Sequence, residues 1–340
     1  MSQRRIGTVL GLRRAGRRTN LTLLAVLICA AVTGGLAFAA GTAGPARLTT
    51  LAHGLFGLAV VLLMPWKTMI IRRAPSLRLT SMILLSLIVI CVGSGLLEVF
   101  GGYGVRWHLS PIQVHVGSAL LATPLLVWHV LGHRRQRLRR VDLSRRTLLR
   151  SGLLAAGVGT TYAALEGTGG LVRSASASRI ATGSHEVAAD AAPATMWLFD
   201  AVPLLSPDHR VAVGGLSYSI SDLVARSTTI TARLDCTSGW YADGTWTAAK
   251  LADLLPQDEL AAAASIEVRS VTGYRRRFPA ADAESLWLAT GYQGRLLQTG
   301  HGAPVRLVAP HRRGFWWVKW VASVQLSDAP AWSQSPFPLQ

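Results

Sequence analysis

The residue with the clearest chemical potential is Cys236, which ends a strand-like run and begins a turn. Residues 228–235 are rich in Thr, Ile and Leu, and Thr-Ser-Gly-Trp follows the thiol at 237–240. A thiol at a strand end, beside a turn that contains glycine, is open to a ligand on one side. Cys29 and Cys91 lie inside apolar runs, so the three cysteines form no disulfide framework. Cys236 is therefore either a reactive or metal-binding thiol or a buried structural cysteine.

The chain that precedes this thiol contains four apolar segments, at 21–40, 48–71, 79–100 and 111–131. Each is long enough to cross a hydrocarbon core of about 30 Å. Residues 1–150 hold 20 Lys and Arg against two acids, whereas the rest of the chain holds 15 of each sign. Because the excess lies beside apolar segments, it predicts membrane orientation and not nucleic-acid binding. The positive-inside rule places the N-terminus and residues 133–150 in the cytoplasm.

Two histidines lie inside the second and fourth apolar segments, near their outer ends. His53 and His115 are both about 6–8 Å deep at 1.5 Å per residue. Facing imidazoles at one depth can bind a haem iron from its two faces, although packing or water-bonded histidines are the alternative. His129 lies about 21 Å deeper on nearly the same face. The matching position of the second segment is near Lys67, so we predict one haem b and not two.

The stretch Ser144 to Arg150 is followed by an apolar run at 152–165. Paired arginines, two apolar residues, a basic residue and a Gly- and Ala-rich core resemble a twin-arginine translocation signal. The alternative is a basic cap on a fifth membrane helix. The helix is either cleaved near 175–177 or retained as an anchor.

The remaining chain has a globular composition from about residue 196. Strand-like runs occur at 210–214, 228–235, 265–272, 305–309 and 315–326, and helical patterns at 219–226, 247–255 and 280–289. This mixture predicts an α+β domain with a core made mainly of strands.

Residues 196–326 resemble the sulfite-oxidase-type molybdopterin oxidoreductases. The resemblance is carried by four motifs: LDCTSGW at 234–240, SVTGYRR at 270–276, GHGAPVRLV at 300–308 and GFWWVKW at 314–320. The membrane part is similar to a four-helix cytochrome b module. In its parts the chain is similar to periplasmic methionine sulfoxide reductases, whose catalytic subunit pairs with a separate haem b membrane protein.

The resemblance implies that Cys236 is a thiolate ligand of molybdenum, which a soft sulfur donor suits. It also implies a pyranopterin cofactor held by Ser238, Trp240, His301, Arg306, Arg312, Arg313 and Lys319. The five basic residues of this set lie within one short stretch and can supply donors to a phosphate. Taken singly, the alternative for each of them is a solvated face.

The predicted fold class is multi-domain, an all-α transmembrane bundle followed by an α+β domain of the sulfite-oxidase type. The predicted boundaries are a basic N-terminus at 1–20, four spans at 21–132, a loop with the export signal at 133–171, a linker at 172–195, the oxidoreductase domain at 196–328 and a tail at 329–340.

The predicted function is a multi-pass membrane enzyme with its catalytic domain outside the cytoplasm. It moves an oxygen atom to or from a small S-oxo or N-oxo substrate and exchanges electrons with membrane quinol or quinone. The twin-arginine translocation machinery is the predicted export partner. Two alternatives remain open: a cysteine-dependent cell-wall hydrolase or transpeptidase, which needs a base histidine, and a redox-inactive binding or sensor module.

Overall fold

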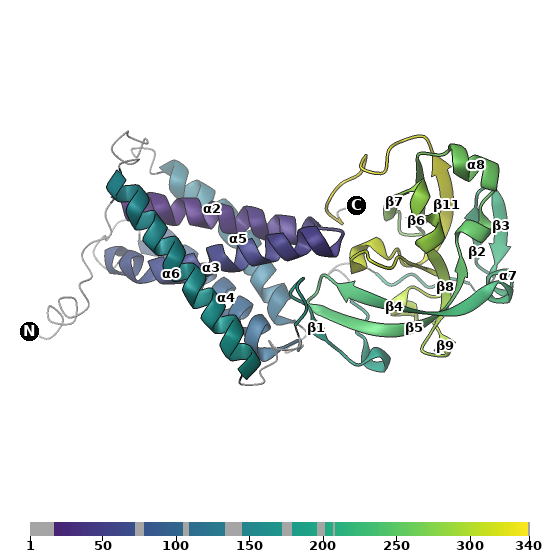
Figure 1. Ribbon diagram of the computed structural model, residues 1–340, viewed down its shortest axis with the longest axis horizontal. Helices are drawn as coiled ribbons and strands as arrows, with labels where there is room; N and C mark the ends of the chain where they lie inside the picture. Colours follow the sequence, from purple (N-terminus) through teal and green to yellow (C-terminus); the bar gives the residue numbers. More distant parts are fainter. Residues whose placement is uncertain are drawn as a thin grey trace, which may run out of the picture. The chain divides into compact units, whose positions relative to one another are not determined.

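The computed structural model describes residues 17–71, 78–104, 109–132, 145–171, 179–195, 201–206 and 208–338. It forms two compact units, one of residues 1–37 and 47–183 and the other of residues 38–46 and 184–340 (Figure 1). Three predicted features lie wholly or largely outside the described residues: the basic N-terminal segment up to residue 16, the first part of the basic loop at 133–144, and the candidate cleavage site 175–177.

The first unit is built from helices. They are α2 (Arg17–Ala39), α3 (Ala43–Ile71), α4 (Arg78–Gly101), α5 (Pro111–Gly132) and α6 (Arg145–Leu171). Within the described residues, four helical stretches are long and apolar enough to cross a membrane, at 19–39, 43–65, 79–101 and 111–132. They agree with the four predicted apolar segments. Helix α6 has 27 residues, which at 1.5 Å each span about 40 Å.

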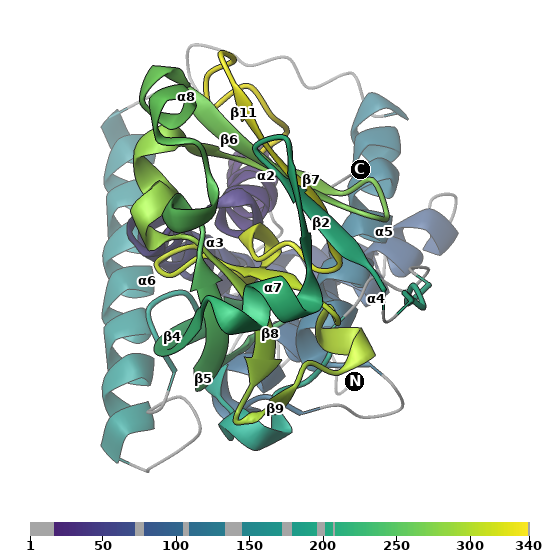
Figure 2. The ribbon, with the colours of Figure 1, turned by 90° about the vertical axis from the view of Figure 1, so that its right-hand side faces the viewer.

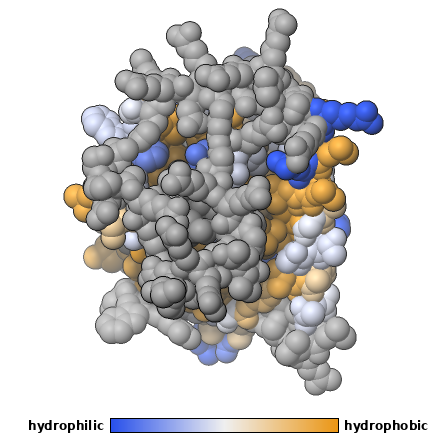
Figure 3. Space-filling model, turned by 90° about the vertical axis from the view of Figure 1, so that its left-hand side faces the viewer, coloured by the Kyte–Doolittle hydropathy of each residue, from blue (hydrophilic) through white to orange (hydrophobic). Residues whose placement is uncertain are grey.

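The core of this unit joins α2, α3 and α6. Leu23, Val60 and Leu63 are buried, and Leu154 of α6 packs against them. The ring of Tyr162, also on α6, lies so close to Gly54 that a Cβ there would be 2.8 Å from it. Large apolar side chains are exposed along the outer helix faces, and Figure 3 shows such side chains at the surface of the unit. Helix α6 is thus packed along the bundle by side chains at two levels.

The second unit contains two sheets, seen in the lower and upper parts of Figure 2. The six-stranded sheet has the order β1-β5-β8-β10, with β4 paired to β5 and β9 to β8. Its strands are β1 (His185–Glu186), β4 (Ser227–Cys236), β5 (Trp240–Lys250), β8 (Trp287–Tyr292), β9 (Arg295–Leu296) and β10 (Arg306–Val308).

The five-stranded sheet has the order β3-β2-β11-β6-β7. Its strands are β2 (Arg210–Val213), β3 (Leu216–Ser219), β6 (Ser265–Ser270), β7 (Arg275–Pro279) and β11 (Val321–Ser327). Helices α7 (Ile220–Ala225) and α8 (Gln257–Ala262) and five 3₁₀ turns connect the strands: η4 (Ala189–Ala191), η5 (Ala252–Leu254), η6 (Ala280–Ser285), η7 (Thr299–His301) and η8 (Gly314–Trp316). The branched apolar residues Val211 and Val213 of β2 and Ile266 and Val268 of β6 alternate along their strands. They are buried, together with Val321 and Val324 of β11, as strands with one face on a core require.

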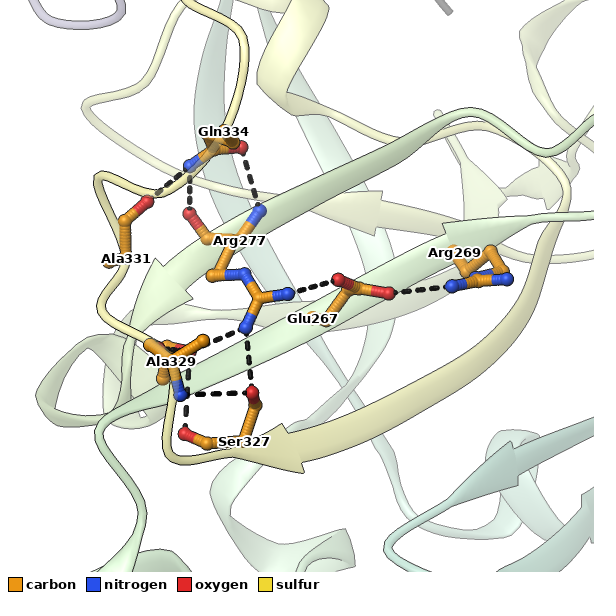
Figure 4. Close-up of polar contacts among 8 residues, drawn as sticks. Glu267, Arg269, Arg277, Ser327, Ala329, Ala331 and Gln334 are labelled. Atoms are coloured by element: carbon orange, nitrogen blue, oxygen red, sulfur yellow. Dashed lines mark hydrogen bonds and ion pairs between the residues drawn. The ribbon is translucent and has the colours of Figure 1, made fainter.

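Strand β7 is an edge strand, and the chain end after β11 covers it. The side-chain amide of Gln334 accepts a hydrogen bond from the backbone N–H of Arg277 at 3.0 Å and donates to its carbonyl at 2.6 Å (Figure 4). The Arg277 guanidinium bonds to Glu267 on β6 and to the Ser327 hydroxyl, both drawn in Figure 4. Gln334 therefore satisfies backbone groups that an open sheet edge would present to other chains. We call residues 328–338 the C-terminal strap.

Two helical predictions were wrong in part. Residues 247–250 continue β5, and only 252–254 form a 3₁₀ turn. Residues 280–285 form a 3₁₀ turn, but 287–292 are β8. Ala248, Ala249 and Ala289 favour helix locally, yet they are fully buried between paired strands, where their small size allows close packing.

Candidate active site

Cys236 is the last residue of β4, and the chain turns directly into β5. Cys236 and Trp240 are paired across this hairpin, and Gly239 has φ +95°, which a residue with a side chain rarely adopts. The Gly239 N–H donates to the Cys236 carbonyl at 3.2 Å. The thiol Sγ lies 3.1 Å from the Ser238 hydroxyl. The predicted placement of the thiol, at a strand end beside a glycine turn, is confirmed.

The backbone at Cys236 is held from behind by the preceding residue. The Ser184 hydroxyl donates to Asp235 at 2.6 Å, and the Arg313 guanidinium lies 3.6 Å from the same carboxylate. A Cβ at Gly314 would be 3.1 Å from the Cys236 Cα, so a glycine at the start of η8 favours its close approach to this strand. These contacts fix the direction in which the thiol leaves the strand.

Arg306 is a buried cation beside this thiol. Its guanidinium lies over the rings of Trp246 and Trp317, at 5.2 and 5.6 Å from their centroids. Its Nε and Nη1 are buried without a hydrogen-bond partner, and Nη2 makes a long bond of 3.5 Å to a carbonyl oxygen. Burial lowers the pKa of Arg306 to about 10, while the charge of the Cys236 thiolate acts in the opposite direction. Arg306 therefore stays charged at neutral pH and has two donors available for an anion.

His301 and Lys319 lie next to Arg306. Gly302 has φ +102°, and a Cβ there would be 3.0 Å from the Cβ of Lys319 and 3.1 Å from the Cβ of Arg306. Lys319 donates to the carbonyl of Gly300 at 2.7 Å. Burial, together with the charges of Arg306 and Lys319, lowers the pKa of His301 to about 4. At pH 7 the imidazole is neutral and can both donate and accept a hydrogen bond.

Thr195 is a site residue that sequence reasoning missed. Its hydroxyl lies 3.1 Å from the Ser238 hydroxyl and accepts the Trp240 indole N–H at 3.0 Å, and its carbonyl accepts from Lys319 at 2.9 Å. Thr195 thus links Cys236, through Ser238, to the cationic side of the site. The sequence predicts a linker at 172–195, whereas the structure places residues 184–195 in the second unit, with β1 parallel to β5. No local pattern could reveal this pairing, because its partners lie about fifty residues away.

Arg312 and Arg313 are held by carboxylates instead of joining the other cations. Arg312 donates to Asp282 at 2.6 Å, and Arg313 pairs with Asp235 as described above. The structure therefore brings together five of the seven residues predicted to bind the cofactor: Ser238, Trp240, His301, Arg306 and Lys319. The two paired arginines shape the loop that backs the thiol.

The first unit holds a second candidate site, made by the two predicted histidines. The Nε2 atoms of His53 and His115 are 3.4 Å apart, and the ring planes are inclined at 83°. The His53 Nδ1 is 2.9 Å from the carbonyl oxygen of Ala30, and the His115 Nδ1 is 2.7 Å from that of Cys91. Since a carbonyl only accepts, both Nδ1 atoms carry the hydrogen, and both Nε2 lone pairs face each other.

This arrangement fits a metal between the rings. Two lone pairs at 3.4 Å repel unless a proton or a metal lies between them, and a carbonyl acceptor on the far nitrogen is the usual outer contact of a metal-bound histidine. Two metal–imidazole bonds of about 2.0 Å need about 4 Å, so an adjustment of less than 1 Å suffices. Gly34 and Gly95 lie against the two rings, and a Cβ at either would be 3.0 or 2.9 Å from an imidazole atom.

The second unit fits a cofactor that brings its own metal ligands. Among the described residues no group of three or more His, Cys, Asp or Glu could hold a metal ion. A metal on Cys236 would therefore take its other ligands from the cofactor. The unpaired donors of Arg306, with neutral His301 and Lys319, suit the phosphate of such a group. Within the described part of the chain the hydrogen-bond partner of the thiol is Ser238, and no histidine is placed as its base.

The comparison with protein-family models agrees with this chemistry. Residues 200–335 match the family model described as "Oxidoreductase molybdopterin binding domain". A solved structure, the sulfane dehydrogenase SoxCD from Paracoccus pantotrophus, matches with 25% identity and a TM-score of 0.35, over 38% of this chain and 40% of that chain. The chain thus spans about two fifths of the length of that structure. No curated protein matches the chain. The family match shows that the second unit contains a molybdopterin-dependent oxidoreductase domain.

Proposed function

We propose that the chain is a membrane-anchored molybdenum oxidoreductase whose catalytic domain lies outside the cytoplasm. It transfers an oxygen atom to or from a small S-oxo or N-oxo substrate. It exchanges electrons with the quinone pool through one haem b held by His53 and His115. A cell-wall hydrolase or a redox-inactive module is not favoured, because the family match points to a molybdopterin cofactor and the hydrogen-bond partner of the Cys236 thiol among the described residues is Ser238 and not a base histidine.

The observation that carries the proposal is Arg306, a buried guanidinium with two unpaired donors beside the Cys236 thiol. Bound molybdopterin supplies the two-electron redox change and the oxygen transfer. The chain's own part is to hold and orient it. Cys236 provides a soft thiolate, and Arg306 and Lys319 provide positive charge. Neutral His301 adds a hydrogen-bond donor that does not increase the local positive charge.

The membrane part of the proposal rests on the facing imidazoles of His53 and His115. Bound haem supplies one-electron transfer. The protein fixes the two rings by carbonyl acceptors from α2 and α4, so both ligand nitrogens point inward. The predicted depth of both histidines places the haem near the outer face of the membrane.

Metal and cofactor analysis of the purified full chain tests the catalytic proposal. We expect about one molybdenum and one pterin per chain and, for Cys236→Ser, loss of turnover. Cys29→Ser is the matched control, because Cys29 lies on α2 in the other unit. Full oxygen-transfer activity of Cys236→Ser, or wild-type protein without molybdenum, would refute the proposal.

Export of the catalytic domain across the membrane can be tested separately. Arg145 and Arg146 begin α6, and we propose that the twin-arginine translocation machinery reads them. Replacing both arginines with Lys keeps the charge but removes the paired-arginine signal. We expect the domain at 196–328 to stay in the cytoplasm, protected from protease added outside the cell. Normal protease accessibility of that domain in the double variant contradicts this role.

A further inference from the structure

Glu98 is a carboxylate inside a helix that is apolar enough to span a membrane. It is the only acidic residue between positions 19 and 141 of the sequence, and it is 5% exposed. It lies near the end of the span at 79–101. A charged group at membrane depth is costly and is retained where it binds a ligand, an ion or a partner group.

Glu98 faces the His115 side of α4. It lies one turn from Gly95, where a Cβ would be 2.9 Å from the His115 Nδ1. It interacts electrostatically with His115 and with Arg179, and it contacts the backbone of Ile112 in the first turn of α5. The N-terminal end of a helix favours negative charge, so the acid is held at this place.

Three further polar side chains lie together: Tyr162, Glu166 and Arg179. The Arg179 guanidinium donates to Glu166 at 2.5 Å, and the Tyr162 phenol interacts with both side chains. The Tyr162 ring packs on Gly54, the neighbour of His53. We call Glu98, Tyr162, Glu166 and Arg179 the outer polar cluster. It combines carboxylate acceptors with guanidinium and phenol donors, and it lies beside residues of the two helices that carry the histidine pair.

We propose that the outer polar cluster binds the head group of a membrane quinol or quinone. A quinol hydroxyl donates a hydrogen bond, which the Glu98 carboxylate can accept, and a quinone carbonyl accepts one, which Arg179 or Tyr162 can donate. A para-quinone presents one oxygen at each end of its ring and so needs polar partners from two directions. The exposed Leu96 and Leu97 directly precede Glu98 on α4 and suit an isoprenoid tail in lipid. This inference rests on the proposed function and assigns the residues that bind its quinone partner.

The choice of a quinone over a purely structural ion pair follows from the position of Glu98. Arg179 already has a carboxylate partner in Glu166. One ion pair, Arg179 with Glu166, is enough to attach this part of the chain to the bundle. Glu98 is a second, buried acid near the same guanidinium and beside His115, so it needs another explanation. A quinone head group beside His115 would also be within a short distance of the haem for electron transfer.

Binding of a fluorescent quinol analogue, heptyl-hydroxyquinoline N-oxide, to the full chain in detergent tests the site. We expect quenching on binding to wild type and an affinity at least about tenfold weaker in Glu98→Gln, the loss of one hydrogen bond to a charged group. Ser94→Ala is the matched control, because this exposed hydroxyl one turn away bonds to its own helix. Tyr162→Phe, which keeps the ring on Gly54, should weaken binding several-fold.

The same preparations are scored for haem absorbance and molybdenum, so that failure of the proposed function is seen separately. Analogue binding that weakens in Glu98→Gln and Tyr162→Phe supports the site even if no haem is present. Wild type with haem and molybdenum that does not bind the analogue overturns the site, and so does unchanged affinity in Glu98→Gln. If Glu98→Gln does not fold, unchanged affinity in Tyr162→Phe overturns it.

Discussion

The guanidinium of Arg306 lies over the indole of Trp246, 5.2 Å from the ring centroid, with its Nε and Nη1 buried and without hydrogen-bond partners. An unpaired buried donor costs free energy, and a buried charge costs more. A cation–π interaction with the indole face offsets part of this free-energy cost. The cost that is left would be relieved by binding an anion.

Arg306→Met should therefore separate folding from cofactor binding. We expect thermal stability of cofactor-free protein to be unchanged or increased, because an uncompensated charge is removed. Retention of molybdopterin through purification should fall by at least about tenfold, since a hydrogen bond to a charged group contributes about 1.5–3 kcal/mol. Arg233→Met, which breaks an exposed pair with Asp243, should leave cofactor content unchanged. Wild-type cofactor content in Arg306→Met contradicts the role given to this residue.

A second prediction concerns pH and His301, whose pKa is lowered to about 4 by burial and by neighbouring cations. The unfolded chain binds the proton near pH 6.5, before the folded chain does, so the folded state loses stability as pH falls from about 6.5 to about 4. The free energy of unfolding that is lost over this pH range is at most about 3 kcal/mol. Thermal unfolding of cofactor-free wild type and His301→Gln at pH 7 and pH 5 measures it. We expect a smaller pH dependence in the variant, and an equal one contradicts the inference.

Local features of the site could be predicted from the sequence, whereas contacts between residues far apart in the sequence could not. The strand end at Cys236 and the glycine turn after it are local features, and both were predicted. Thr195 and Ser184 were not, because each reaches the site through contacts with residues more than forty positions away. Ala248 and Ala249 were assigned to a helix, since local propensity carries no information about the strand β8 that pairs with them.

The third prediction concerns the C-terminal strap. Gln334 bonds to both backbone groups of Arg277 and to the Ala331 carbonyl, so Gln334→Ala removes bonds to an edge strand. We expect the free energy of unfolding of the catalytic domain to fall by about 1–3 kcal/mol. Trp332→Ala, two residues away and 83% exposed, should change it by less than about 0.5 kcal/mol. Denaturant titration of both variants tests this, and equal effects contradict the role of the strap as an edge cover.

The fourth prediction concerns the histidine pair of the membrane unit. His53→Ala and His115→Ala should each lose a low-spin b-type spectrum, whereas His129→Ala should keep most of it. The molybdenum domain should still turn over with a soluble artificial electron carrier in His53→Ala, while quinol-linked activity is lost. Absorbance of the reduced protein tests the ligands directly. No haem band in wild type, or a band lost only in His129→Ala, contradicts a single outer haem.

Helix α4 allows a finer version of this test, because it carries one glycine against the His115 ring, Gly95, and another two residues away, Gly93, that is not in contact with it. A Cβ at Gly95 would lie 2.9 Å from the His115 Nδ1, closer than side-chain contacts normally come, whereas a Cβ at Gly93 meets nothing within 4 Å. Gly95→Ala should push the His115 ring away from its carbonyl acceptor on Cys91 and so weaken the iron–imidazole bond. We expect a mixed-spin spectrum and slow haem loss in Gly95→Ala and a wild-type spectrum in Gly93→Ala. Equal spectra for the two variants would mean that His115 does not occupy this position when the protein holds haem.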